Sequence, residues 1–166
     1  MHGHIESLLD RGVDFIFYPC ESYNLDEHDS INHYNCPVVA YYPELLKANN
    51  ERLTQENFVM PYLDPNDEAT TVRSLHRALA RWKLSPWLIR RAYRAGLAAL
   101  EQYHADVVAE GKRILENAGR EGRQVIVLAG RPYHADPEIN HGIADMITSY
   151  GFAVLTEDSV SHLGKV

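Results

Sequence analysis

Hydrophobic positions along the chain alternate between short runs of β-branched and aromatic residues and longer stretches with helical spacing. Two of the short runs predict buried strands over residues 13–19 and 57–63. The run Pro37–Tyr42 predicts another strand between them, for the same reason. A short helix over residues 5–11, closed by a glycine, is expected to precede the first strand. The polar cluster at 64–67, Asp-Pro-Asn-Asp, is the clearest turn signal in the chain and predicts a boundary between two lobes.

The middle of the chain has the spacing of helices. From Glu68 to about Asn117, leucines and aromatic residues recur at steps of three and four positions. Ser85 and Pro86 divide this stretch into two helices, since serine is a favoured N-cap and proline is tolerated in a first helical turn. We interpret the regularly spaced apolar side chains as core residues rather than as ligand contacts.

The last part of the chain predicts a strand–loop–helix–strand unit. Gln124–Gly130 is apolar on both faces, which is typical of a buried parallel strand. A loop follows, then a helix that should begin at Asp136-Pro137-Glu138 and run to Tyr150, and then a strand over Phe152–Thr156. A right-handed crossover is expected to join the two strands.

Together these elements predict an α/β protein. We expect an open, mostly parallel sheet with Rossmann-like or flavodoxin-like strand–helix–strand units and an inserted pair of helices. Residues 1–67 would form an α/β part that carries both cysteines, 68–118 a helical segment, and 119–166 the last unit. We interpret the chain as a fragment of a larger protein, in which this last unit would continue.

Charge is unevenly distributed over the 166 residues. The net charge is −7, but the stretch from Ala69 to Leu100 holds seven basic residues and no acid. Such a helical surface could pair with acids of its own chain, or meet an acidic partner or phosphate groups; nucleic acid is not favoured. There is no apolar run of membrane-spanning length and no signal peptide at the start, so a cytoplasmic protein is expected.

The only two cysteines flank an acidic and polar loop. Cys20 follows the first predicted strand and Cys36 precedes the next. Because chemistry in open α/β sheets collects beyond the carboxyl ends of the strands, these sulfurs are candidate ligands for iron–sulfur or zinc. They could also be packing residues of a reduced protein, or form a disulfide. A zinc site with His28 and His33 would match no known finger spacing.

A second candidate region follows the apolar strand of the last unit. The loop Gly130–His134 links a strand to a predicted helix start, where backbone N–H groups favour anions and Arg131 could add a bidentate contact. Its glycines lack the spacing of a Walker loop or of a dinucleotide fingerprint. Polar side chains crowd this corner and could form either a metal site or an ordinary polar loop. They are His134, Asp136, Glu138 and His141.

Several separated motifs point to one family. They are His2-Gly-His-Ile, Gly12-Val-Asp-Phe-Ile-Phe-Tyr-Pro-Cys20, Tyr34-Asn-Cys-Pro37, Gly130-Arg-Pro-Tyr-His134, Asp136-Pro-Glu-Ile-Asn-His-Gly142 and Leu155-Thr-Glu-Asp158. In these motifs the chain resembles the dehydratase-like module of the 2-hydroxyacyl-CoA dehydratase and activase superfamily. Specifically, it resembles the very long bacterial proteins known as CoA-substrate-specific enzyme activases. The resemblance runs from residue 2 to about 163.

The resemblance implies iron–sulfur redox chemistry. An ATP-dependent activase domain or subunit would be the partner that supplies a low-potential electron, and an acyl-CoA or another small molecule would be the substrate. Cys20 and Cys36 would be cluster ligands, and Arg131 and His134 would line the same crevice or contact CoA phosphates. A further cysteine is expected just upstream of His2, so this chain would hold an incomplete cluster site and be inactive alone.

A different class of function remains open from the residues. The basic helical surface could make the chain a non-catalytic docking or structural domain that binds an acidic partner. Such a domain would expose apolar residues beside Arg90, Arg91 and Arg94. Oligomer formation is compatible with either function.

Overall fold

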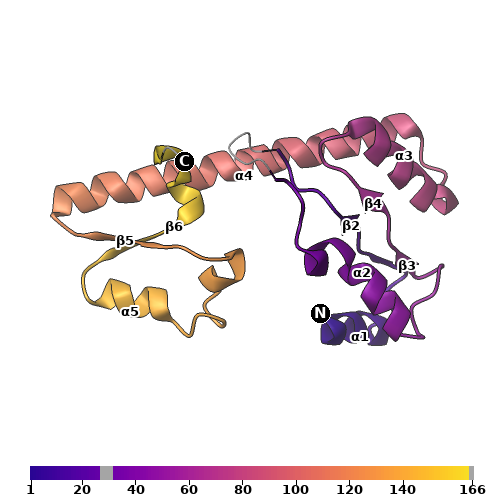
Figure 1. The fold of residues 1–166 in the computed structure, drawn as a ribbon, viewed down its shortest axis with the longest axis horizontal. Coiled ribbons are helices and arrows are strands. Elements are labelled where there is room, and N and C mark those ends of the chain that lie inside the picture. Colours follow the sequence, from indigo (N-terminus) through magenta and orange to yellow (C-terminus); the bar gives the residue numbers. More distant parts are fainter. Residues whose placement is uncertain (27–31, 165–166) are drawn as a thin grey trace. The chain divides into compact units, whose positions relative to one another are not determined.

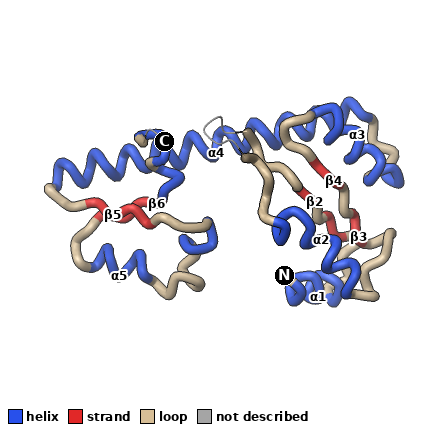
Figure 2. The backbone as a smooth tube through the Cα atoms, viewed as in Figure 1, coloured by secondary structure: helices blue, strands red, loops and turns tan. Residues whose placement is uncertain are grey.

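A computed structural model of the chain describes residues 1–26 and 32–164. It divides into two compact units, Met1–Ala95 and Gly96–Val166, with the boundary inside the long helix α4 (Pro86–Glu121). Helices predominate, and every pair of named strands is parallel (Figures 1 and 2). The predicted α/β class is confirmed, whereas Rossmann-like or flavodoxin-like units stay a prediction.

The first unit contains two short parallel strand pairs. They are β1 (Ile16–Phe17) with β3 (Phe58–Val59), and β2 (Cys20–Glu21) with β4 (Tyr62–Leu63). The predicted strands over 13–19 and 57–63 therefore exist and lie beside each other, although each is interrupted.

A pair of prolines explains the interruption. Pro19 precedes Cys20 as Pro61 precedes Tyr62, so the register of the second strand pair places the two prolines opposite each other. Proline has no backbone N–H and cannot donate to the ladder. The ladder resumes at once, because the Cys20 N–H donates to the Pro61 carbonyl at 2.8 Å.

Helices surround these strands in the first unit. They are α1 (His2–Asp10), α2 (Pro37–Asn49), α3 (Glu68–Ala78), a 3₁₀ turn η1 (Ala80–Trp82) and the start of α4. Helix α2 lies beside β2 and α3 lies beside β4 (Figure 1). The core consists of buried side chains from the helices, the strands and the segment before β3. They are Ile5, Ile16, Leu46, Leu53 and Phe58.

The strand predicted over Pro37–Tyr42 is wrong, because these residues form the first turns of α2. Val38 and Val39 are exposed, while Ala40, Pro43 and Leu46 are buried. This spacing of three positions puts the buried residues on one helical face, so tertiary packing overrides the β propensity of a short valine run. Pro37 at the first helical position is compatible with the helix start.

The second unit is built on one parallel strand pair, β5 (Val125–Leu128) with β6 (Ala153–Thr156), as predicted. Helix α5 (Ile143–Ser149) lies next to β6. Three 3₁₀ turns complete the unit: η2 (Pro132–Ala135), η3 (Glu157–Ser159) and η4 (Ser161–Leu163).

The helix predicted over Glu138–Tyr150, with Asp136 as its N-cap, is too long, because only Ile143–Ser149 is helical. Asp136 does cap, but it accepts the backbone N–H groups of Glu138 and Ile139 within a turn. His141 and Gly142 both have left-handed backbones, with φ of 54° and 72°, so a right-handed helix cannot pass through them.

Within the described ranges, no helix combines the length and the apolar character needed to cross a bilayer. Helix α4 has the length, since it spans 36 residues, but it carries charged residues throughout.

Candidate functional sites

The two cysteines lie at the base of one loop. The Asn35 N–H donates to the Ser22 carbonyl at 3.0 Å, and the Asn35 side chain donates to the Glu21 carbonyl at 2.9 Å. An isolated antiparallel bridge between Tyr23 and Tyr34 extends this contact. Cys20 immediately precedes one paired segment and Cys36 immediately follows the other.

Their side chains have different environments. Cys20 is fully buried and packs near Glu44 of α2, whereas Cys36 is exposed at the N-cap of the same helix. Eight positions separate Cys36 from Glu44, which is about 12 Å of rise along a helix. Burial raises the pKa of the Cys20 thiol; the Glu44 carboxylate raises it further, while the Glu44 backbone amide lowers it.

No disulfide forms, since both cysteines are free. Among the described residues, no group of three or more histidine, cysteine, aspartate or glutamate side chains is arranged to hold a metal ion. The two sulfurs therefore do not complete an iron–sulfur or zinc site with other side chains of the described ranges. They could supply at most part of a ligand set.

Two histidines are candidates for a zinc site. His28 lies outside the described residues, and His33 has another partner, as does His2 of the first motif. The Nε2 atom of His33 lies 3.5 Å from an Asp26 carboxylate oxygen. His2 lies in α1, where its Nδ1 is 3.4 Å from the Tyr42 hydroxyl. These contacts favour local structural roles for His2 and His33.

Two backbone N–H groups of the loop after β5 already donate to protein acceptors. The Gly130 N–H donates to the Glu157 carboxylate at 2.7 Å, and the Arg131 N–H donates to His134 Nδ1 at 2.9 Å. A bound anion would have to compete with these contacts and would meet the negative charge of Glu157. The predicted group of polar side chains from His134 to His141 forms no metal-binding cluster within the described ranges.

Most of the basic residues between Ala69 and Leu100 have partners in the first unit. Arg90 and Arg94 both pair with Glu68, at 2.9 and 2.7 Å, and these contacts help to lower the pKa of Glu68. Arg81 donates to the Glu56 carbonyl, and its guanidinium carbon lies 3.9 Å from the centre of the Trp82 ring. The interpretation that the basic surface pairs with acids of its own chain therefore holds for Arg90 and Arg94.

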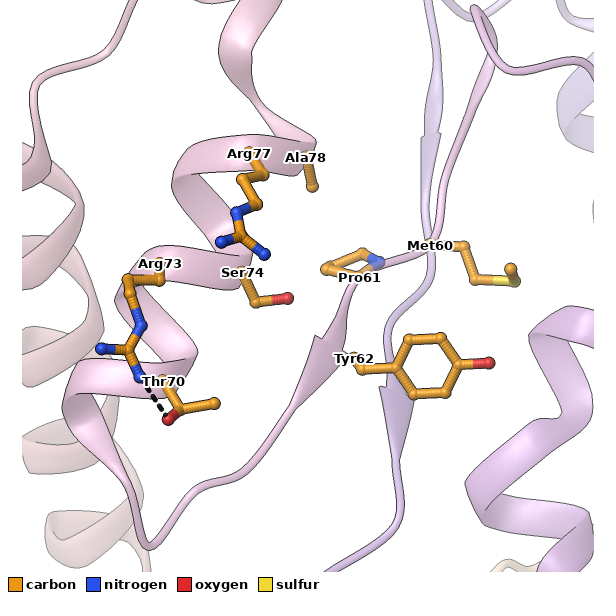
Figure 3. A pocket seen from close by; sticks show the side chains of 8 residues that line it. All are labelled: Met60, Pro61, Tyr62, Thr70, Arg73, Ser74, Arg77 and Ala78. Carbon is orange, nitrogen blue, oxygen red and sulfur yellow. Dashed lines mark hydrogen bonds between the residues drawn. The ribbon is translucent and has the colours of Figure 1, made fainter.

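Arg73 and Arg77 differ from Arg90 and Arg94. Neither forms a salt bridge with a carboxylate in the part of the chain that the structure describes. Both line a cleft of about 910 Å³ between α3 and the strand segment at β4, shown in Figure 3. The remaining lining residues are Met60, Pro61, Tyr62, Thr70, Ser74 and Ala78.

Sequence reasoning missed this cleft as a site, although its spacing is visible. Thr70, Arg73, Ser74 and Arg77 occupy positions i, i+3, i+4 and i+7, which is one face of a helix. The sequence could not show the opposite wall of the cleft, which Met60, Pro61 and Tyr62 form at the start of β4.

Comparison with known proteins supplies the family. A family model described as a CoA enzyme activase uncharacterised domain matches residues 1–160. No curated protein and no solved structure gives a significant match. The model covers nearly the whole chain and agrees with the resemblance carried by the separated motifs. The chain therefore belongs to the CoA enzyme activase uncharacterised domain family.

Proposed function

We propose that the chain is a cytoplasmic domain of a CoA-substrate-specific enzyme activase protein and is dehydratase-like in function. In this proposal it contributes Cys20 and Cys36 to an iron–sulfur cluster that receives low-potential electrons from an ATP-dependent activase domain or subunit. An acyl-CoA or another small molecule would be the substrate. The observation that carries the proposal is the family match over residues 1–160, together with both cysteines at the base of one loop.

The fit of a cluster to this chain is partial. Thiolates are the usual protein ligands of iron–sulfur clusters, and metal binding removes the thiol proton outright. Cys36 is exposed and open to an incoming metal, whereas Cys20 is buried, so its sulfur would need α2 or the loop to shift. The other ligands would have to come from outside the described residues. A bound cluster would supply one-electron transfer, and this chain's part would be to hold it and to shield one side of it.

The packing of α2 around Cys20 would shield a bound cluster on one side. Helix α2 covers β2, and the Tyr62 hydroxyl donates to Glu44 on that helix, which ties α2 to β4. These contacts keep water away from Cys20. Arg131 and His134 lie in the second unit and remain lower-ranked candidates for contact with a CoA phosphate, because their loop pairs its own N–H groups.

Anaerobic iron–sulfur reconstitution tests the proposal. The chain and a version extended upstream by its natural residues would be compared, each also with Cys20→Ala and with Cys36→Ala. Iron and sulfide content, optical spectra and electron paramagnetic resonance would be measured. A cluster in the extended protein that either alanine abolishes supports the proposal. A cluster that survives both substitutions, or an extended protein that binds none, contradicts it.

A docking function has one specific observation in its favour. On α4, Trp87 is 63% exposed and Leu88 is 39% exposed, and the Arg91 guanidinium carbon lies 5.1 Å from the centre of the Trp87 ring. Exposed tryptophan beside arginine is typical of residues that dominate protein interfaces. If the chain is a docking domain that uses this surface, Trp87→Ala should weaken its binding to an acidic partner protein, and cluster content should not change.

A further inference from the structure

Two arginines of the first unit carry positive charges that the neighbouring carboxylates do not fully neutralise. Arg73 and Arg77 are one helical turn apart on α3, so their side chains leave the same face of the helix. The Arg73 Nη2 donates a hydrogen bond to the Thr70 hydroxyl at 2.9 Å. Within the described ranges, no salt bridge joins either guanidinium to a carboxylate.

The nearest acid is already used. Asp67 acts electrostatically on Arg73, but it is the N-cap of α3 and accepts the Thr70 N–H at 3.0 Å and the Thr70 hydroxyl at 2.5 Å. The other acid at this end of α3, Glu68, is held by Arg90 and Arg94. The two acids at the start of α3 are therefore committed to other partners, and neither closes an ion pair with the arginines of the cleft.

The surroundings of the two arginines form a concave site. The cleft of about 910 Å³ has Ser74 on the helix side and Pro61 on the strand side, which face each other in Figure 3. A smaller hollow of about 270 Å³ adjoins the same two arginines and adds His76 and Arg90. Sites for small molecules in proteins measure about 300–1,000 Å³, so the larger cleft has room for a small molecule.

The chemistry of the lining selects the ligand. Guanidinium groups match the geometry of phosphate oxygens and bind them through paired hydrogen bonds, and the hydroxyl of Ser74 can add a further donor. The Thr70 hydroxyl already donates to Asp67. Among the residues that the structure describes, no aspartate or glutamate lines either hollow. Met60, Pro61 and Ala78 offer apolar contact for a part of the ligand that carries no charge.

We infer that the cleft between α3 and β4 binds a phosphorylated small molecule through Arg73 and Arg77, with a diphosphate group held between the two guanidinium groups. Neither cysteine lines this cleft, and the inference does not depend on whether they bind a cluster. The diphosphate could be free or carried on a larger molecule such as a nucleotide.

Calorimetric titration of the 166-residue chain tests the inference, with pyrophosphate, ADP and coenzyme A as separate probes at near-physiological salt. Saturable binding of at least one probe is expected. Arg73→Gln and Arg77→Gln should each weaken it about tenfold, which corresponds to about 1.4 kcal/mol, because each removes one guanidinium that binds the diphosphate. The double substitution should abolish binding. Glutamine is a good helix former, so α3 should persist, which circular dichroism would verify.

The matched control is Arg11→Gln, an exposed position at the end of α1 that lines neither hollow. It removes the same charge from the same unit and should leave binding unchanged. Tighter binding of ADP or coenzyme A than of pyrophosphate would indicate a carried diphosphate, and the reverse a free one; either outcome supports the site. Absence of saturable binding, equal weakening by the control, or binding only to a poly-glutamate peptide would each overturn it.

Discussion

Gly111→Ala gives a sharp test of packing in the second unit. Gly111 lies in α4 and is buried against η3. A Cβ atom at this position would come within 2.6 Å of the Ser159 carbonyl oxygen and 2.8 Å of the Ser159 Cβ. Favourable carbon contacts begin near 3.5 Å, so the added methyl group would have to push η3 away from the helix.

The expected magnitude follows from two opposing effects. Replacing a helical glycine by alanine normally stabilises by about 1 kcal/mol. Overpacking a tight contact costs about 1–3 kcal/mol. Because the obstacle is backbone rather than the end of a flexible side chain, we expect the cost to exceed the gain.

Gly119→Ala on the same helix is the matched control, because a Cβ there has nothing within 4 Å. It should gain the helix propensity without any overpacking. The free energies of unfolding of the two variants should then differ by about 1–3 kcal/mol, measured by urea denaturation followed by circular dichroism. If Gly111→Ala were as stable as Gly119→Ala, the close approach of Ser159 to α4 would be refuted.

Three further predictions concern single groups. Iodoacetamide at pH 7.5 should modify Cys36 quickly and Cys20 only after unfolding, because Cys20 is buried and its pKa is raised; equal rates in peptide mass spectrometry would contradict this. The pKa of Asp67 is lowered, first by the hydrogen bond from the Thr70 hydroxyl, so its stabilising effect is present above its unfolded pKa and is lost as pH falls through the folded one. Asp67→Asn keeps a capping oxygen that does not titrate. The Tm of the wild type should therefore fall relative to the Tm of this variant only at acidic pH. A difference between the two Tm values that stays constant from pH 7 to 2.5 would refute the reasoning. Gly130→Ala would place a methyl group against the His134 ring, so the NMR signals of the loop should shift, and an unchanged spectrum would show that the ring does not cover the glycine.

The sequence predicted those elements whose pattern and local chemistry agree. The strand after Gly122 is apolar throughout and pairs in parallel as expected, and Ser85 caps α4 through its side chain, which accepts the Leu88 N–H. The strands predicted over 13–19 and 57–63 of the first unit also exist. Their interruption could not be predicted, because only the register shows that Pro19 and Pro61 lie opposite each other.

The errors arose where short runs can adopt either structure. Pro37–Tyr42 has the composition of a strand, but burial at every third residue along α2 makes it a helix, and that burial depends on the rest of the fold. The left-handed backbone at His141 could not be predicted either, because histidine adopts positive φ angles much less readily than glycine does. The family match was foreseen from separated motifs, which do not depend on secondary structure.

The candidate sites differ in what the fold leaves available to a ligand. At the loop after β5, where the sequence favoured an anion, the Gly130 N–H already meets a carboxylate, so the feature that suggested binding is consumed by structure. On α3 the reverse holds. The acids that could have neutralised the helix serve as a cap and as a partner of α4, and their commitment leaves Arg73 and Arg77 with positive charge beside a cleft. A charged group is costly to leave without a partner only when it is buried, and these two arginines are exposed. The fold can therefore keep them free at little cost to its stability, which is the condition that an anion-binding site requires.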